Sequence, residues 1–146
     1  MKKTFTLLFS LLLFSFAVQS QVYCLKGSLQ GSQQVPANGS TATGVVIVRY
    51  NATSKLLELW GDYHNLTTAI TGSHIHGPAG PGVNAAVLFT LANTGGVTGT
   101  ISGTFTLTPA QETDLLAGNY YVNTHTSTFP GGEIRAQLTT TSLRQS

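Results

Sequence analysis

The sequence has few charged residues. Aspartate, glutamate, lysine and arginine make up 8% of its 146 residues, and beyond Lys3 the chain carries five basic and five acidic side chains. No cluster of basic residues is left that could hold the phosphates of a nucleic acid or the headgroups of an anionic membrane. The composition therefore excludes nucleic acid as an expected partner.

Cysteine is almost absent, with Cys24 as the single example. One thiol cannot form a disulfide within the chain, so the fold has to be stabilised by its core and by strand pairing. We expect Cys24 to be a buried or an intermolecular thiol.

Long hydrophobic runs are also missing, apart from one near the N-terminus. An uncharged apolar run from Leu7 to Val18 follows Lys2 and Lys3, and it is shorter than the ~20 residues of a membrane-spanning helix. A basic start followed by a short apolar run is typical of a secretory signal peptide. We predict a signal peptide over 1–20 and one domain over 21–146, secreted to the periplasm or the extracellular space without membrane attachment. An N-terminal membrane anchor is the alternative that the length of the run disfavours.

The sequence shows no pattern typical of a hydrolase. Its five acidic residues are scattered along the chain, and neither a Ser–His–acid arrangement nor a pair of catalytic carboxylates stands out.

Short runs of alternating apolar and polar residues, separated by turn-forming residues, fill the rest of the chain. This pattern predicts an all-β fold, a Greek-key-like β-sandwich or barrel of about eight strands. The expected strands cover 22–31, 43–51, 55–63, 71–76, 85–91, 97–107, 119–126 and 132–140.

One short helix is expected near 109–117, crossing one end of the sandwich. Thr108 and Gln111 have the spacing of a capping box, and Pro109 suits the first helical turn. Gly118 can end the helix in a left-handed conformation.

Two of the four histidines stand one residue apart, in "SHIHGPAGPG" at 73–82. If Ile75 faces the core, strand alternation places His74 and His76 together on the other face. Their backbones would lie ~6.5–7 Å apart, so both rings could meet one ion. A third histidine from an adjacent strand would complete a site for copper or zinc. The alternative is a plain surface pair beside a tight turn.

The same alternation turns polar side chains outward on two later strands. The outward residues are Tyr121, Asn123 and His125 on one strand and Glu133, Arg135 and Gln137 on the next. Whether these strands neighbour the strand of His74 depends on strand order, which alternation does not provide.

His64 belongs to another polar stripe, with Glu58 and Asp62, along "KLLELWGDYH". We interpret it as a solvated residue at a strand end and retain it as a candidate fourth metal ligand.

Three blocks resemble the CHRD domain, a module named for chordin: "LQGSQQVPANGSTATG" (29–44), "GSHIHGPAGPG" (72–82) and "LLAGNYYVNTHTSTFPGGEIRAQL" (115–138). The resemblance covers about 25–138. It implies a β-sandwich related to Greek-key folds and an extracellular setting, and it implies little about activity.

The stretch "DYHNLTTAITGSHIHGPAG" is also similar to copper/zinc superoxide dismutases. The similarity implies that His74 and His76 match the copper-binding pair and that His125 matches a later copper ligand. Arg135 would correspond to the arginine that guides the anionic substrate. The segment between Gly77 and Val122 has no histidine, and its single aspartate lies in the expected helix, so the zinc-binding loop has no counterpart. The resemblance therefore implies one copper ion.

Two functions follow from these patterns. The first is a secreted copper-binding domain that could dismute superoxide, in which Arg135 attracts the anion. For Arg135, an ion pair with Glu58 or Glu133 is the alternative. The second is a non-catalytic adhesion or protein-binding module, for which the low charge and an exposed Tyr121 would suit an interaction surface.

Overall fold

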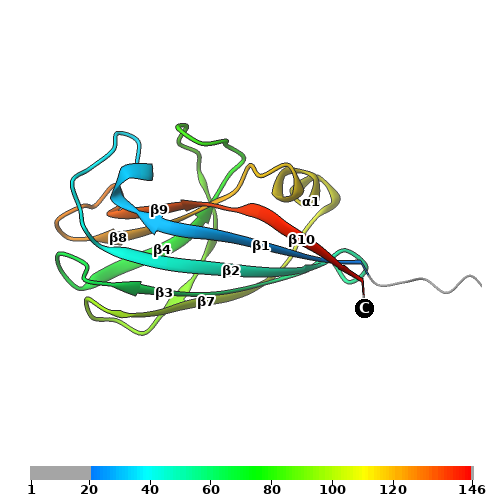
Figure 1. Ribbon diagram of the computed structural model, residues 1–146, viewed down its shortest axis with the longest axis horizontal. Coiled ribbons are helices and arrows are strands. Elements are labelled where there is room, and N and C mark those ends of the chain that lie inside the picture. The colour runs from blue at the N-terminus through cyan, green and yellow to red at the C-terminus, as the bar shows by residue number, and fades with distance from the viewer. Residues whose placement is uncertain (1–20, 146) are drawn as a thin grey trace, which may run out of the picture.

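The computed structural model describes residues 21–145 as one antiparallel sheet of ten strands with one α-helix and one short 3-10 helix (Figure 1). The strands are β1 (Gln21–Gln30), β2 (Thr43–Asn51), β3 (Leu56–His64), β4 (Ile70–His76), β5 (Val87–Thr90), β6 (Ala92–Asn93), β7 (Gly99–Thr106), β8 (Tyr121–Thr126), β9 (Ile134–Gln137) and β10 (Thr139–Gln145). The helices are η1 (Gly31–Gln33) and α1 (Pro109–Leu116).

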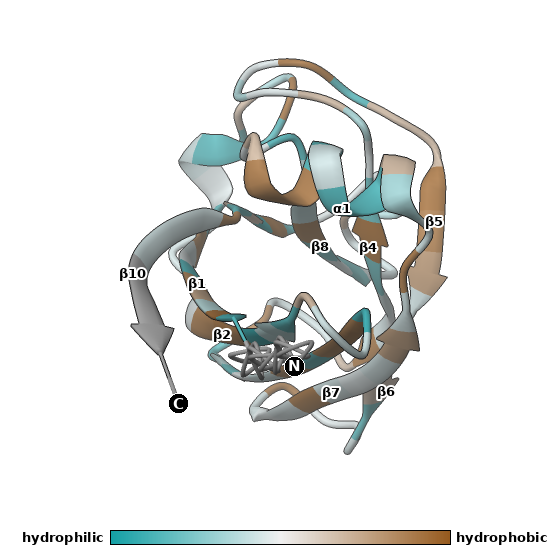
Figure 2. Ribbon diagram, turned by 90° about the vertical axis from the view of Figure 1, so that its right-hand side faces the viewer, coloured by the Kyte–Doolittle hydropathy of each residue, from teal (hydrophilic) through white to brown (hydrophobic). Residues whose placement is uncertain are grey.

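The sheet is nearly closed into a barrel. Its strand order is β5-β4-β8-β9-β1-β2-β3-β7-β6, with β10 also paired to β1. The two ends of this order, β5 and β6, are separated by Leu91 alone, whose N–H donates to the Ser73 carbonyl at 2.9 Å. The segment from β5 to β6 therefore pairs with β4 through β5 and with β7 through β6. This leaves few strand-edge backbone groups of the sheet unpaired at the point where the barrel closes. Figure 2 shows the strands arranged around a common centre.

Apolar side chains on alternate positions fill the inside of this barrel. Along β2, Val46, Val48 and Tyr50 are fully buried, whereas Val45 and Ile47 between them are about half exposed. The two-residue period of an extended chain produces this division. The predicted all-β class is confirmed, and the buried face supplies the stability that disulfides do not.

The structure has more strands than the eight expected, for two local reasons. The expected strand at 132–140 is divided at Leu138, because β9 continues the β8 pairing and β10 pairs only with β1. The short β6 comes directly after β5 and pairs with β7.

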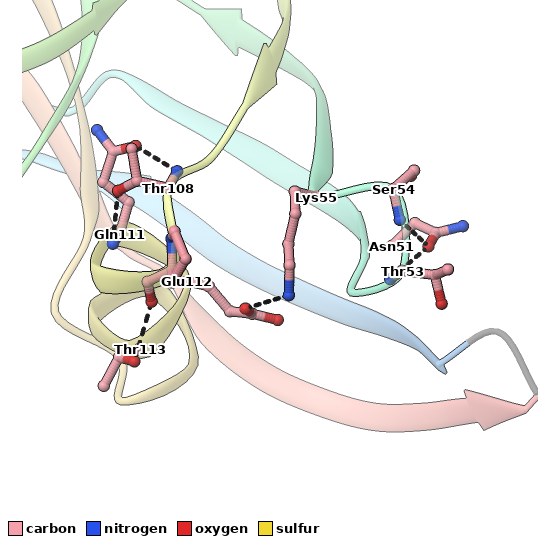
Figure 3. A network of polar contacts seen from close by, with 9 residues as sticks. Asn51, Thr53, Ser54, Lys55, Thr108, Gln111, Glu112 and Thr113 are labelled. Carbon is pink, nitrogen blue, oxygen red and sulfur yellow. Dashed lines mark hydrogen bonds and ion pairs between the residues drawn. The ribbon is translucent and has the colours of Figure 1, made fainter. Parts of the chain in front are cut away.

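The helix is confirmed at the expected position and with the expected cap (Figure 3). Thr108 Oγ1 accepts from the Gln111 N–H, and Gln111 Oε1 accepts from the Thr108 N–H. Gly118 follows the helix with φ +78°, a conformation that costs glycine little. Lys55 donates to Glu112 at 2.6 Å, which ties the helix to the turn before β3.

The predicted signal peptide, 1–20, lies outside the described residues. Within 21–145, no helix combines the length and the hydrophobicity that crossing a bilayer requires.

Candidate metal centre

Strand order places the three polar stretches found in the sequence on one face. β8 lies between β4 and β9, and each pair is antiparallel. Gly72 stands opposite His125, and His74 stands opposite Asn123, which itself stands opposite Arg135. Residues directly opposite one another point to the same side of a sheet. The outward side chains of β4, β8 and β9 are therefore neighbours.

His74, His76 and His125 form a cluster on this face. One ring nitrogen from each lies within 4.8 Å of the others. The ring centroids of His74 and His125 are 5.0 Å apart, and those of His74 and His76 are 5.8 Å apart. Imidazole nitrogens bind Zn²⁺ at ~2.0–2.1 Å, so small ring movements would bring all three onto one ion.

Backbone carbonyls orient two of the rings. His76 Nδ1 is 2.9 Å from the Ala85 carbonyl oxygen, and His125 Nδ1 is 3.0 Å from that of Pro130. Because a carbonyl only accepts, each Nδ1 carries a proton, and in the neutral form of either ring the free lone pair is then on Nε2. Histidine ligands of metal ions are commonly oriented in this way.

Each ring of the cluster also has one buried nitrogen without a hydrogen-bond partner. These atoms are Nδ1 of His74 and Nε2 of His76 and His125. Leaving one buried polar group unsatisfied costs about 1–3 kcal/mol. Three neighbouring rings, each with one such atom, are a feature that a shared ion would satisfy.

The environment keeps two of the histidines neutral. Burial lowers the pKa of His74 below 6.5, and the nearby His125 and His76 lower it further. Burial also lowers the pKa of His76, although the Ala85 carbonyl acts in the opposite direction. Neutral imidazole is the form that binds a metal ion.

These shifts predict how the metal-free protein responds to acid. Since the folded-state pKa of His74 and of His76 is below the unfolded value of 6.5, the unfolded chain binds more protons as the pH falls below 6.5. Proton uptake by the two rings therefore has no effect on folding well above that pH, and it favours the unfolded chain increasingly as the pH falls from 6.5 through the lower folded-state pKa. Histidine proton NMR across pH 4–8 is expected to show both rings titrating below 6.5, and midpoints at or above 6.5 would contradict this.

The glycine- and proline-rich loop after His76, residues 77–86, is attached to the same face. The Ala85 carbonyl accepts from the Tyr121 hydroxyl at 3.3 Å as well as from His76, and the Ala85 N–H donates to the Tyr121 oxygen at 3.0 Å. The loop thus covers the end of the cluster where His76 is 8% exposed.

Tyr121 connects the cluster to Arg135. Its ring stacks on His76 with centroids 4.9 Å apart and planes 9° apart, and the Arg135 guanidinium carbon lies 3.5 Å from its centroid. The Tyr121 side chain is 2% exposed. The expectation of an exposed Tyr121 on an interaction surface is therefore wrong, because the loop and Arg135 cover the ring.

Arg135 is turned away from the core as expected, but it is buried rather than open to solvent, with 1% exposure. Its guanidinium donates to Asn84 Oδ1, to the Gly80 carbonyl and to Gln137 Oε1 at 3.1–3.3 Å. These bonds hold the 77–86 loop against β9. The role of Arg135 as an anion guide stays a prediction.

Neither ion pair suggested for Arg135 is found among residues 21–145. Glu58 pairs instead with Arg49 at 2.9 Å. The Glu133 carboxylate is fully buried and accepts only from Ser40, Thr67 and Thr126.

His64 lies apart from the cluster. It is at the end of β3, its side chain is 50% exposed, and its Nε2 is 3.6 Å from Asp62 Oδ1. The interpretation as a solvated residue fits this position, and the metal-capable group does not include it.

Sequence reasoning missed the groups that support the histidines. Ala85 and Pro130 act through their backbone carbonyls. Since every residue has such a carbonyl, the residue types at these positions do not indicate this role. Asn123 accepts from Gln34 at 2.7 Å and donates to the Gly131 carbonyl at 3.1 Å, joining two loops beside the cluster. The predicted outward position of Asn123 on its strand was the single feature of the sequence that pointed to this role.

The chain was compared with known proteins. A family model described as the CHRD domain matches residues 25–138. No match was found among the curated proteins or among the solved structures.

Proposed function

The chain belongs to the CHRD domain family, and from this premise we propose that it is an extracellular module that binds one copper ion through His74, His76 and His125. Two observations carry the proposal: one ring nitrogen from each histidine lies within 4.8 Å of the others, and each ring has one buried nitrogen without a hydrogen-bond partner. An ion would replace three unsatisfied groups with three bonds.

The choice of copper rests on the donor set. Neutral imidazole nitrogens suit both copper and zinc. A nitrogen site generally binds Cu²⁺ more tightly than Zn²⁺ among the divalent first-row ions. The sequence similarity of His74, His76 and His125 to a copper site supports the same choice.

A copper titration of the purified, metal-free protein tests this proposal. We expect saturation at one equivalent, with nitrogen hyperfine structure in the EPR spectrum of the Cu²⁺ form, and only partial displacement by equimolar zinc. Binding far below one equivalent, or a spectrum without nitrogen ligands, would overturn it.

The more specific part of this proposal is that the copper-loaded protein catalyses the dismutation of superoxide. A bound copper ion would supply one-electron redox chemistry. The 1% exposure of Arg135 means that its charge would attract an anion through its field rather than by contact. Metal-dependent loss of superoxide, slowed in Arg135→Gln, is the expected result, and equal rates with and without copper would contradict it.

A protein-binding role is a second candidate, favoured by the outer face of β2 and β3. Val45, Ile47 and Trp60 are 46%, 55% and 50% exposed, and Ile47 is paired with Trp60 across the strands. Exposed apolar side chains that gather in this way can mark an interaction surface. A partner whose binding survives metal removal but not Trp60→Ser would support this role.

A further inference from the structure

The orientation of the His125 ring depends on one backbone carbonyl. His125 Nδ1 is 3.0 Å from the Pro130 carbonyl oxygen, and the second ring nitrogen, Nε2, is buried without a hydrogen-bond partner. Because the carbonyl only accepts, Nδ1 carries a proton, and in the neutral ring the lone pair that could bind an ion is on Nε2. The residues that fix the Pro130 carbonyl therefore also fix the His125 ring.

Pro130 lies in a tight turn between β8 and β9. The Phe129 carbonyl accepts from the Gly132 N–H at 3.0 Å, which closes a four-residue turn over 129–132 with proline at its second position. Proline suits this position because its side-chain ring fixes φ. The direction of the Pro130 carbonyl therefore depends on how Phe129, the first residue of the turn, is held.

Phe129 is held by a side chain at the end of β8. Its N–H donates to Thr126 Oγ1 at 3.2 Å, and the Thr126 hydroxyl donates to Glu133 Oε2 at 2.7 Å. A hydroxyl has a single hydrogen. Since an ionised carboxylate only accepts, that hydrogen is donated to Glu133, and the oxygen lone pairs remain for the Phe129 N–H. Thr126 and Glu133 are both fully buried, so bulk water does not compete for the bond between them.

We propose that Thr126 and Glu133 are positioning residues for His125. Their hydrogen bond fixes the start of the 129–132 turn, and the Pro130 carbonyl of that turn selects the ring form that leaves Nε2 free for an ion. The consequence for metal binding rests on the proposed copper site, whereas the consequence for the ring does not require a metal.

Thr126→Val tests the inference, because it replaces the hydroxyl with a methyl group of similar size. NMR of nitrogen-labelled histidine in the metal-free full chain, at a pH where the rings are neutral, is expected to show His125 protonated at Nδ1 in the unchanged protein and a mixture of both neutral forms in the variant. Loss of a partner that orients a metal ligand typically weakens binding 10–100-fold, so copper binding is expected to weaken by about 10-fold, since Thr126 acts through Pro130. Thr126→Ser keeps the hydroxyl and is expected to retain both properties.

Thr124→Val is the matched control. Thr124 is also a fully buried threonine of β8, but its hydroxyl is 3.2 Å from Ser73 Oγ on β4. The control is expected to lose comparable stability and to keep the His125 ring form and the copper affinity of the unchanged protein. Thr126→Cys, whose thiol is a weak donor and acceptor, covers the case in which the valine variant does not fold, and it is expected to show a smaller change in the same direction.

The outcomes separate this inference from the copper site itself. An unaltered His125 ring form in Thr126→Val and Thr126→Cys would overturn the inference, as would an equal change in Thr124→Val. An altered ring form with unaltered copper affinity would overturn its consequence for the metal. An altered ring form in a chain that binds no copper would overturn the proposed copper site while supporting the positioning of His125.

Discussion

Replacing His74 and His76 together with alanine is expected to abolish stoichiometric copper binding. The double change removes two of the three ring nitrogens that converge within 4.8 Å and leaves His125 alone. Loss of a residue that only supports a metal ligand typically weakens binding 10–100-fold, so loss of two ligands should weaken it by more than about 100-fold. Competition titration against a copper chelator measures the difference.

His64→Ala is the matched control for that experiment. It also removes one imidazole, but from the exposed end of β3, where His64 is near Asp62. Its copper affinity is expected to equal that of the unchanged protein. Equal affinity for the double variant and the unchanged protein, with both folded by circular dichroism, would rule out the cluster as the copper site.

Replacing Glu133 with glutamine is expected to destabilise the fold by about 3 kcal/mol or more. The carboxylate is fully buried and accepts hydrogen bonds from the hydroxyls of Ser40, Thr67 and Thr126 and from the Thr67 N–H, at 2.7–2.9 Å. Each bond to a charged group contributes about 1.5–3 kcal/mol. A glutamine amide would turn its own N–H groups toward some of these donors.

Denaturant unfolding of the variant measures this loss. Glu58→Gln is the control, because Glu58 forms an ion pair with the half-exposed Arg49, and exposed pairs are worth about 0–1 kcal/mol. If Glu133→Gln were no more destabilising than Glu58→Gln, the buried carboxylate would not connect the three segments as argued.

The Glu133 carboxylate also makes the free energy of unfolding depend on pH. Burial by itself would raise the pKa of Glu133, but hydrogen bonds from Thr126, Ser40 and Thr67 outweigh it and lower the pKa below 4.5. The stabilisation is therefore present above the unfolded value of 4.5 and is lost as the pH falls through the lower folded value. The Glu133→Gln variant should lack this loss.

The local features of the chain were predictable because they depend on near neighbours. The Thr108–Gln111 cap is formed by residues three apart, and its two hydrogen bonds are found as expected. Alternation about Ile75, which is fully buried, correctly turned His74 and His76 to the same outward face. Both results follow from the geometry of one helix turn or one strand.

What covers the outward face was not predictable in this way. Arg135 and Tyr121 do point away from the core, but their exposures of 1% and 2% result from the 77–86 loop, which is distant from both in the sequence. The bonds of Glu133 likewise come from three separate segments. An alternating pattern indicates a direction and carries no information about what lies in that direction.

The sequence by itself determined the all-β class, the capped helix, the CHRD family and the outward direction of the histidines, since these depend on short-range periodicity and on local motifs. Only the tertiary structure decided that β8 lies beside β4. That pairing brings His125 to His74 and His76 and leaves His64 apart. The physical reason is that strand order is set by how the whole barrel closes over its core, and no single strand carries that information.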